Sequence, residues 1–267
     1  MTAPDPLAPY KAALRAHYPE PEVIYRAARR RRAARRTFAV AVIAIGAAFL
    51  GWRDPAYRTQ SFQTAIGEHR DWTLADGSRL SLNTGSALRA EWHLRSRRLT
   101  LLRGEAAFDV AASKLRRFSV AVDDVRITDI GTVFAVRQAD ARIRVQVFAG
   151  EVEVRSPDGI QRLGAGSGIE LDHGKLRSAA TVRMQDLAWR EGRIVFDGTP
   201  LAEAVAEIAR YRRAPARIAD AGAAQLRISG QFDTARPDAM LDALPRILPV
   251  DLRRTADGGV EIGLRKS

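Results

Sequence analysis

The chain has 267 residues, a formal net charge of +12 and a pI near 10.9. This length fits one or two domains, and the absence of cysteine excludes disulfides, thiol catalysis and zinc sites with cysteine ligands. Half of the charge excess is local: residues 1–36 contain nine Lys or Arg and three Asp or Glu, so they contribute +6, and the following 231 residues contribute the other +6.

The N-terminal tail, residues 1–28, contains five prolines that divide it into short pieces. A helix is expected between Leu7 and Tyr18, and a second helix is expected to run from Glu22 into the apolar segment that follows. The tail is too short for a core of its own. It is either a partly ordered cytoplasmic tail or an amphipathic segment that binds a partner.

An arginine cluster at residues 29–36 precedes an uncharged apolar segment, residues 37–52. As a helix this segment is about 24 Å long, slightly less than the roughly 30 Å of a hydrocarbon core. Snorkelling of the last two arginines extends the span, and Trp52 suits the opposite interface. We therefore predict one transmembrane helix with its N-terminus in the cytoplasm and everything after Trp52 outside. A cleaved signal peptide and a buried core helix are the alternatives.

From residue 60 to residue 180 apolar side chains recur with a period of two, as in half-buried strands. Glycine turns lie between the alternating runs at Asp76-Gly77, Asp158-Gly159 and His173-Gly174. We predict an all-β domain of ten or more short strands, either a sandwich or a roll. The alternating runs are residues 79–83, 118–122, 142–147 and 151–154.

Residues 187–265 combine helical and strand patterns, and they predict a small α+β domain of order β-α-β-β-α-β. Thr199 is expected as the N-cap of the first helix, with Pro200 as its first residue. Pro245 is expected to bend or shorten the second helix. The join near residues 178–186 is short and polar, so we place the domain boundary there. The expected elements are strands at 193–196 and 226–232, helices at 201–211 and 237–248, and two strands around Asp257-Gly258.

Enzymatic constellations are hard to find, and we expect no enzyme, metal or cofactor. The four histidines have neither metal-ligand nor triad spacing. The glycine-rich run at 164–168 lacks the Lys-Ser/Thr ending of a phosphate loop and the frame of a nucleophile elbow. Asp123 and Asp124 are consecutive, so on a strand they point to opposite faces.

One dipeptide offers chemistry. Gly131-Thr132 precedes an alternating apolar run, and a Thr hydroxyl can attack the carbonyl before it and convert the amide into an ester that hydrolyses. Such an acyl shift needs a strained peptide, which a glycine in an unusual conformation supplies. The alternative is a glycine that only lets the chain turn into a strand.

A series of motifs runs in order along the chain. These motifs resemble those of the FecR family of sigma-factor regulators, and the resemblance covers about Gly67 to Leu264. From Trp189 onward it concerns a short module of the secretin and TonB type. The motifs are Gly67-Glu68, Leu74-x-Asp76-Gly77-Ser78-x-Leu80-x-Leu82-Asn83, Arg98-x-x-Leu101-x-x-Gly104-Glu105-Ala106-x-Phe108-x-Val110, Phe118-x-Val120, Gly131-Thr132-x-Phe134-x-Val136, Val145-x-Val147-x-x-Gly150-x-Val152-x-Val154, Trp189-x-x-Gly192-x-x-x-Phe196-x-x-x-Pro200-Leu201, Arg210-Tyr211 and Ser229-Gly230-x-Phe232.

The resemblance implies an anti-sigma factor in a cell-surface signalling relay. It implies a single-pass inner-membrane protein with periplasmic domains that sense a TonB-dependent outer-membrane transporter, often one for an iron chelate. The tail would bind an extracytoplasmic-function sigma factor. The resemblance also implies stepwise proteolytic activation, sometimes beginning at the position of Gly131-Thr132.

The tail departs from the family, whose members usually have a longer sigma-binding region with several helices and tryptophans. Here it has about 36 residues and no tryptophan. Either it folds on the sigma factor, or it has lost this partner. The expected sigma-factor anchors are Leu14, Tyr18, Val23, Ile24 and Tyr25.

For the transporter, we expect an added strand along the edge that carries Leu226, Ile228, Gly230 and Phe232. The alternative is that this strand is interior to its own sheet. Inner-membrane lipid is a further expected partner, and direct nucleic-acid binding is not expected.

Two rival functions remain for the whole chain. The first is an envelope structural or scaffold protein without a role in transcription, which the short tail favours. The second is a basic DNA-binding protein, which would leave the membrane fraction at high salt.

Overall fold

The computed structural model describes residues 10–11, 13, 21–113, 116–129 and 131–265. The chain divides into two compact units, Met1–Pro55 and Ala56–Ser267.

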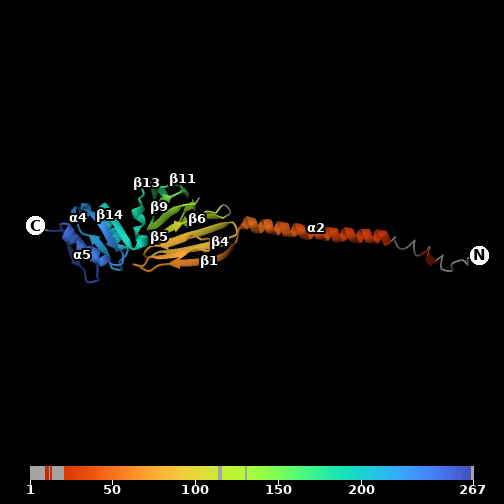
Figure 1. Cartoon of the computed structure of the whole chain (residues 1–267), viewed down its shortest axis with the longest axis horizontal. Helices are drawn as coiled ribbons and strands as arrows, with labels where there is room; N and C mark the ends of the chain where they lie inside the picture. Colours follow the sequence, from red (N-terminus) through yellow and green to blue (C-terminus); the bar gives the residue numbers. More distant parts are fainter. Residues whose placement is uncertain (1–9, 12, 14–20, 114–115, 130, 266–267) are drawn as a thin grey trace, which may run out of the picture. The chain divides into compact units, whose positions relative to one another are not determined.

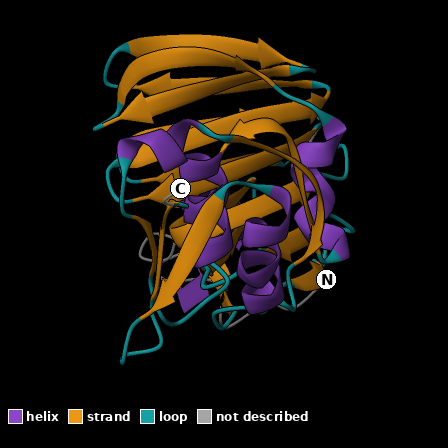
Figure 2. Cartoon of the chain, turned by 90° about the vertical axis from the view of Figure 1, so that its left-hand side faces the viewer, coloured by secondary structure: helices purple, strands orange, loops and turns teal. Residues whose placement is uncertain are grey.

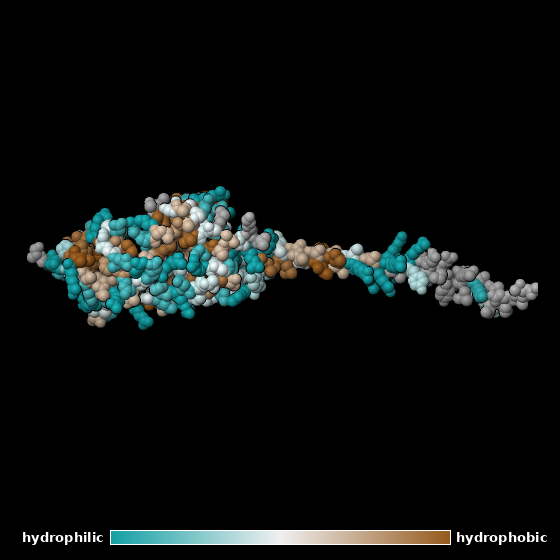
Figure 3. Space-filling model, viewed as in Figure 1, coloured by the Kyte–Doolittle hydropathy of each residue, from teal (hydrophilic) through white to brown (hydrophobic). Residues whose placement is uncertain are grey.

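The first unit contains a long helix, α2 (Pro21–Arg53), coloured orange-red in Figure 1. Its part from Arg29 to Arg53 is 25 residues long with a hydropathy of 1.6, and none of its most apolar window is buried, as it would be in a core helix. Figure 3 shows the hydrophilic arginines followed by the apolar stretch. The Thr37 hydroxyl donates to the carbonyl oxygens of Ala33 and Ala34, at 3.2 and 2.9 Å, so this polar group is satisfied within the helix. The helix therefore begins ahead of the apolar segment, as the sequence predicted.

Thirteen strands form one continuous hydrogen-bonded sheet at the start of the second unit, which confirms a β-rich domain with more than ten strands. We call this part, residues 56–181, the β lobe. Positive φ angles occur at three predicted turns, 84° at Gly77, 128° at Gly159 and 73° at Gly174. The strands are β1 (Ala56–Gln63), β2 (Arg70–Thr73), β3 (Arg79–Leu82), β4 (Ala87–His93), β5 (Ser96–Asp109), β6 (Arg117–Val122), β7 (Val125–Asp129), β8 (Val133–Ala139), β9 (Arg142–Ala149), β10 (Glu151–Ser156), β11 (Gly159–Gly164), β12 (Ser167–Asp172) and β13 (Lys175–Thr181).

The long strand β5 connects two layers of this sheet. Its first half pairs with β4 and β6, and its second half pairs with β3 and β8. Gly104 lies between the halves with φ 85°, and a Cβ there would be 2.3 Å from Ser86 Oγ and 2.7 Å from Ser86 Cα. Only glycine fits this crossing. The strand order β11-β10-β7-β6-β5-β8-β9-β12-β13 continues both layers from this shared strand.

Alternating apolar side chains of both layers meet in one core. Phe108 stacks on Phe134 with centroids 4.9 Å apart, and Phe118 packs edge-on to Phe108 at 5.8 Å. All three rings are fully buried. The period-two pattern read from the sequence therefore does place one face of each strand in the interior.

Residues 184–264 follow as a smaller part, which we call the α+β lobe. Its strands form two sheets, β14-β16 and β15-β18-β17, and α3 and α5 pack against strands of these sheets. Figure 2 shows its helices in front of the strands. The elements are η1 (Met184–Glu191), β14 (Arg193–Pro200), α3 (Leu201–Ala209), β15 (Ala216–Ile218), α4 (Ala221–Gln225), β16 (Arg227–Asp233), α5 (Pro237–Ile247), β17 (Val250–Arg254) and β18 (Val260–Leu264).

The ends of two helices differ in how well the sequence predicted them. The helix α3 is present where it was predicted, but its predicted N-cap was wrong. The N-cap is Pro200, which makes no side-chain capping bond, and Thr199 still belongs to β14, where it pairs with Ile228. By contrast, α5 begins at Pro237 and carries Pro245 within its last turn, as predicted. The sequence reading missed η1, β15 and α4, which are short. The α+β lobe has its own apolar core, separate from that of the β lobe.

Candidate functional site

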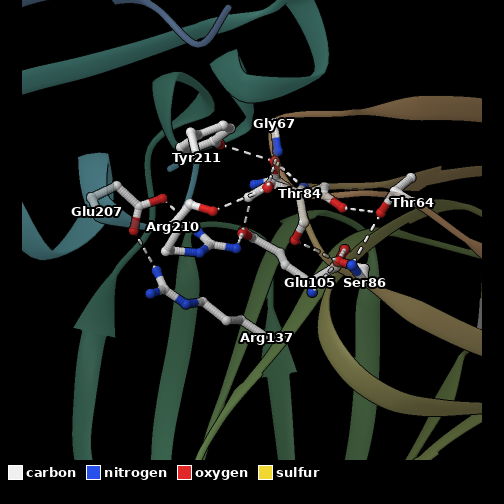
Figure 4. A network of polar contacts seen from close by, with 10 residues as sticks. Thr64, Gly67, Thr84, Ser86, Glu105, Arg137, Glu207, Arg210 and Tyr211 are labelled. Carbon is white, nitrogen blue, oxygen red and sulfur yellow. Dashed lines mark hydrogen bonds and ion pairs between the residues drawn. The ribbon is translucent and has the colours of Figure 1, made fainter. Parts of the chain in front are cut away.

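Charged side chains, one of them buried and three half-buried, link the two lobes. Glu105 on β5 lies opposite Arg137 on β8, and both side chains point to the α+β lobe, whose helix α3 supplies Glu207 and, just after its end, Arg210. Arg210 donates to Glu105 Oε2 at 2.7 Å and to Glu207 Oε1 at 2.5 Å. Arg137 donates to the other oxygen of Glu207 at 2.6 Å. Two arginines and two carboxylates thus alternate across the boundary, and we call them the interlobe ion network (Figure 4).

Uncharged groups complete the network. The Tyr211 hydroxyl donates to Asn83 Oδ1 at 2.9 Å, and Asn83 Nδ2 donates to Glu105 Oε2 at 2.9 Å. The Thr84 hydroxyl donates to the backbone oxygen of Arg210 at 3.1 Å and accepts from the Gly67 N–H at 2.7 Å. Every one of these groups lies inside or next to a motif quoted for the family resemblance. The motifs at Gly67, Leu82-Asn83, Gly104-Glu105 and Arg210-Tyr211 therefore converge at one place in the fold.

The network shifts the pKa values of three of its members, Arg210, Glu207 and Tyr211. Burial lowers the pKa of Arg210, but the charges of Glu105 and Glu207 outweigh this effect and raise it, so the guanidinium stays charged. Burial raises the pKa of Glu207, but the charges and hydrogen bonds of Arg210 and Arg137 outweigh it and hold the pKa below its ordinary value. Burial also raises the pKa of Tyr211, with the Glu207 charge adding to the effect. Arg210 and Glu207 therefore keep their charges, and the network acts as a structural contact between the lobes.

A cleft of about 740 Å³ opens beside this network, lined by β8, β9, η1 and β14. Its lining mixes arginines and carboxylates with Trp189 and Phe196. The indole Nε1 of Trp189 is buried and makes no hydrogen bond within the described residues. Sequence reading gave no signal for this cleft, because its lining comes from strands and a helix far apart in the chain.

The Gly131-Thr132 peptide lies at the start of β8. Gly131 has φ 101°, and its N–H donates to Asp129 Oδ2 at 2.9 Å. Thr132 is 3% exposed, its hydroxyl donates to Asp129 Oδ1, and its carbonyl oxygen accepts from the Val110 N–H at 3.0 Å. Gly131 therefore has the unusual glycine conformation that was predicted from the sequence. The contact of the Asp129 carboxylate with the dipeptide was not predicted.

Gly150 approaches the same peptide from the end of β9. Its φ is 80°, and a Cβ there would be 2.6 Å from Thr132 Cγ2 and 2.7 Å from the Gly131 oxygen. Any larger residue would displace this peptide. The hydroxyl, the carboxylate and the glycine peptide are held together by contacts from β5, β7 and the end of β9.

Strand β8 joins the two places. Val133 follows Thr132 directly, and Arg137 on the same strand belongs to the interlobe ion network. Leu187 and Trp189 of η1 pack on Ala107 and Ala135, with Val133 partly covered by the same cluster. The α+β lobe thus contacts the strand that begins at the Gly-Thr peptide.

The expected sigma-factor residues fall mostly outside the described part of the chain. Leu14 and Tyr18 lie in undescribed segments, and Val23 and Ile24 lie on α2 with side chains that the structure does not describe. Tyr25, also on α2, is 71% exposed.

The expected transporter-binding strand is β16, whose partner in its two-stranded sheet is β14. Ile228 is buried in the core of the α+β lobe, Leu226 is partly buried against it, and Phe232 packs against Phe196 with centroids 5.6 Å apart. Gly230 lies opposite Phe196 with φ 154°. A partner strand would therefore meet the backbone of β16, because these side chains already pack within the lobe.

Comparison with known proteins finds a family model that matches part of the chain and solved structures with a similar fold. The family model described as FecR protein matches residues 60–153. Two crystal structures of a "putative anti-sigma factor" from Parabacteroides distasonis are similar. One, at 1.65 Å resolution, has 24% identity and a TM-score of 0.66, and covers 78% of this chain and all of that one. The other, at 2.50 Å, has 25% identity and a TM-score of 0.64, and covers 79% of this chain and all of that one. No curated protein matches.

Proposed function

We propose that this chain, which carries a FecR domain at residues 60–153, is a transmembrane regulator of an extracytoplasmic-function sigma factor. The observation that carries the proposal is the FecR match to the β lobe, strengthened by a fold shared along three quarters of the chain with proteins named as anti-sigma factors. The exposed basic-apolar helix ahead of the domain supports a membrane protein with one span.

The proposed topology places the tail in the cytoplasm and both lobes in the periplasm. The arginines at the N-terminal side of α2 support this direction, because positive flanks remain inside. An alkaline phosphatase fused after residue 267 is expected to be active, and the same enzyme fused before residue 1 is expected to be inactive. The reverse pattern would refute the topology.

We assign the sigma factor to the tail and α2, with the five residues Leu14, Tyr18, Val23, Ile24 and Tyr25 as contacts. The exposure of Tyr25 supports this assignment, since a contact residue must be accessible. A tail peptide of residues 1–36 is expected to retain an extracytoplasmic-function sigma factor of the same cell in a pull-down. A triple variant with Val23, Ile24 and Tyr25 changed to Ser should lose that binding, while Lys11→Ser should keep it.

We assign the outer-membrane side of the relay to the α+β lobe, with a TonB-dependent transporter, in iron-chelate uptake, as its partner. Among the described residues β16 pairs with β14 alone, which supports this assignment, because a strand with one unpaired edge can accept another. The lobe would thus be the secretin and TonB type module of residues 187–265. Full-length protein in detergent should bind the signalling domain of a TonB-dependent transporter of the same cell, and Ser229→Pro, which disturbs the backbone of β16, should reduce that binding.

Activation would include cleavage between Gly131 and Thr132. The positive φ of Gly131 and the hydroxyl contact of Thr132 support this step. The full chain should yield fragments that end at Gly131 and begin at Thr132, and Thr132→Ala should abolish them. If Thr132→Ala gives the same fragments as wild type, a separate protease makes the cut.

The rival function is an envelope scaffold protein that uses the same lobes without a sigma factor. Residues 1–36 contain five prolines and no tryptophan, unlike the sigma-binding regions of the family, and this composition favours it. Deletion of residues 1–28 separates the two. A regulator should change transcription from the sigma factor's promoters when the tail is removed, whereas a scaffold should not.

A further inference from the structure

We infer that Asp129 is the proton acceptor for an acyl shift at Gly131-Thr132, an inference that rests on the proposed cleavage step. The side chain of Asp129 contacts both halves of the dipeptide. One carboxylate oxygen accepts from the Gly131 N–H at 2.9 Å, and the other accepts from the Thr132 hydroxyl. The second contact places a base on the one hydroxyl that can attack the Gly131 carbonyl through a five-membered ring.

The step balances within this chain and one water molecule. Thr132 Oγ1 gives its proton to the Asp129 carboxylate and forms a bond to the Gly131 carbonyl carbon. The bond from that carbon to the Thr132 nitrogen then breaks, and the leaving nitrogen takes the proton from Asp129 and becomes an amine. Water hydrolyses the resulting ester, which releases a carboxylate at Gly131 and the free Thr132 hydroxyl. Gly131 is exposed, so water can reach the ester.

The backbone around the dipeptide favours this step. Gly131 has φ 101°, a conformation that glycine adopts readily and L-residues rarely adopt, so the turn ahead of Thr132 depends on glycine at this position. Gly150 packs against the Gly131 oxygen and the Thr132 methyl group from the opposite side, which limits how the Thr132 side chain turns. The Thr132 hydroxyl is therefore held against the Asp129 carboxylate.

A purely structural role for Asp129 predicts something different. A carboxylate that accepts from the N–H two residues later forms an ordinary Asx turn, and such a turn needs no base. Asparagine keeps an Asx turn but is not a base. Asp129→Asn therefore separates the two roles, because it retains the acceptor for Gly131 N–H and removes the basicity.

The test uses the full chain purified in detergent, with the two fragments quantified by mass spectrometry over time. Wild type and Thr132→Ser should cleave, because both have a hydroxyl. Asp129→Asn should cleave at least about 100-fold more slowly, the lower range of a positioned general base. Its melting temperature should equal that of wild type, which shows that the fold survives.

A thiol rescue supplies the readout that a structural role would not move. The chain has no cysteine, so Thr132→Cys introduces the only thiol. A thiol has an ordinary pKa of about 8.5 and forms its nucleophile without a carboxylate base. The double variant Asp129→Asn with Thr132→Cys should therefore cleave on addition of hydroxylamine, which opens the thioester, while Asp129→Asn alone keeps its slow rate of cleavage.

Three results would overturn the inference. If wild type is never cleaved at this peptide, both the proposed cleavage and the role of Asp129 fail. If Asp129→Asn cleaves as fast as wild type, the cleavage stands and Asp129 is only a turn residue. If the folded double variant also stays intact with hydroxylamine, Asp129 is needed to hold the backbone and is not a base.

Discussion

Arg210→Met is the sharpest test of the interlobe ion network. Arg210 donates to Glu105 and to Glu207, and methionine keeps the length of its apolar stem but removes the charge. Glu105 is left with the hydrogen bond from Asn83 Nδ2 and without its counter-ion, while its side chain is only 7% exposed. Arg137 still pairs with Glu207, so the loss concerns Glu105 above all.

The expected cost follows from that uncompensated charge. Removal of one partner of a buried pair costs about 3–5 kcal/mol, and the remaining Asn83 bond favours the lower end, about 3 kcal/mol. In the double variant with Glu105→Gln the charge is gone and an amide oxygen can still accept from Asn83. This variant should recover about 1–2 kcal/mol relative to Arg210→Met.

Urea unfolding of residues 56–267, the second compact unit, measures these free energies. Arg79→Met is the matched control, because Arg79 forms an ion pair with Asp109 while 65% exposed, and such a pair contributes about 0–1 kcal/mol. If Arg210→Met costs no more than Arg79→Met, or if Glu105→Gln gives no recovery, the network does not stabilise the contact between the lobes.

Gly104→Ala should destabilise the same unit by about 2–3 kcal/mol or more, because the added methyl group would overlap Ser86 and because the residue has a positive φ. As a control, Gly164→Ala should change the free energy of unfolding by no more than about 0.5 kcal/mol in the same urea experiment, because its methyl group meets open space. The fall in stability at acid pH should depend on Asp76. Burial raises the pKa of Asp76, but hydrogen bonds from Arg97 and Ser78 and the Arg97 charge outweigh burial and hold the pKa below its ordinary value. Its contribution is therefore complete above about pH 4, where the unfolded carboxyl is also ionised, and is lost as the pH falls through the lowered pKa of the folded state. Asp76→Asn should flatten the fall of the urea midpoint below pH 4, and an unchanged acid profile would contradict the assignment.

Local patterns predicted much of the fold. A strand with one buried face, such as residues 142–147, can be predicted because apolar and polar residues alternate along it. Pro237 marks a helix start because a missing N–H costs no hydrogen bond at the first helical position. Thr199-Pro200 gave the wrong boundary because the hydrogen-bonded pairing of β14 with β16 continues through Thr199, and this tertiary contact outweighs a local capping preference.

The candidate site was predicted only in part, since sequence spacing carries no information on which side chains converge. Gly131-Thr132 could be identified from the sequence because the proposed acyl shift involves only a Thr hydroxyl and the carbonyl of the residue before it. Asp129 lies only three residues before Thr132, yet nothing in an isolated acidic residue shows that both of its oxygens turn toward that dipeptide. The pair Glu105 and Arg210 is separated by 105 residues, and only the packed lobes bring it together.

The position of β8 gives the two sites a physical connection. A relay needs an element that contacts the sensing part and whose state alters the responding part. Arg137 and Ala135 of β8 contact the α+β lobe through Glu207 and η1, and the strand begins one residue after Thr132. If a partner shifts the α+β lobe, β8 loses an ion pair and part of its apolar cover together. The backbone next to Gly131, which has a positive φ, is then the place where this loss changes the geometry of the peptide. Partner binding is therefore expected to act on the rate of the proposed cleavage, rather than on any enzyme activity of the lobes.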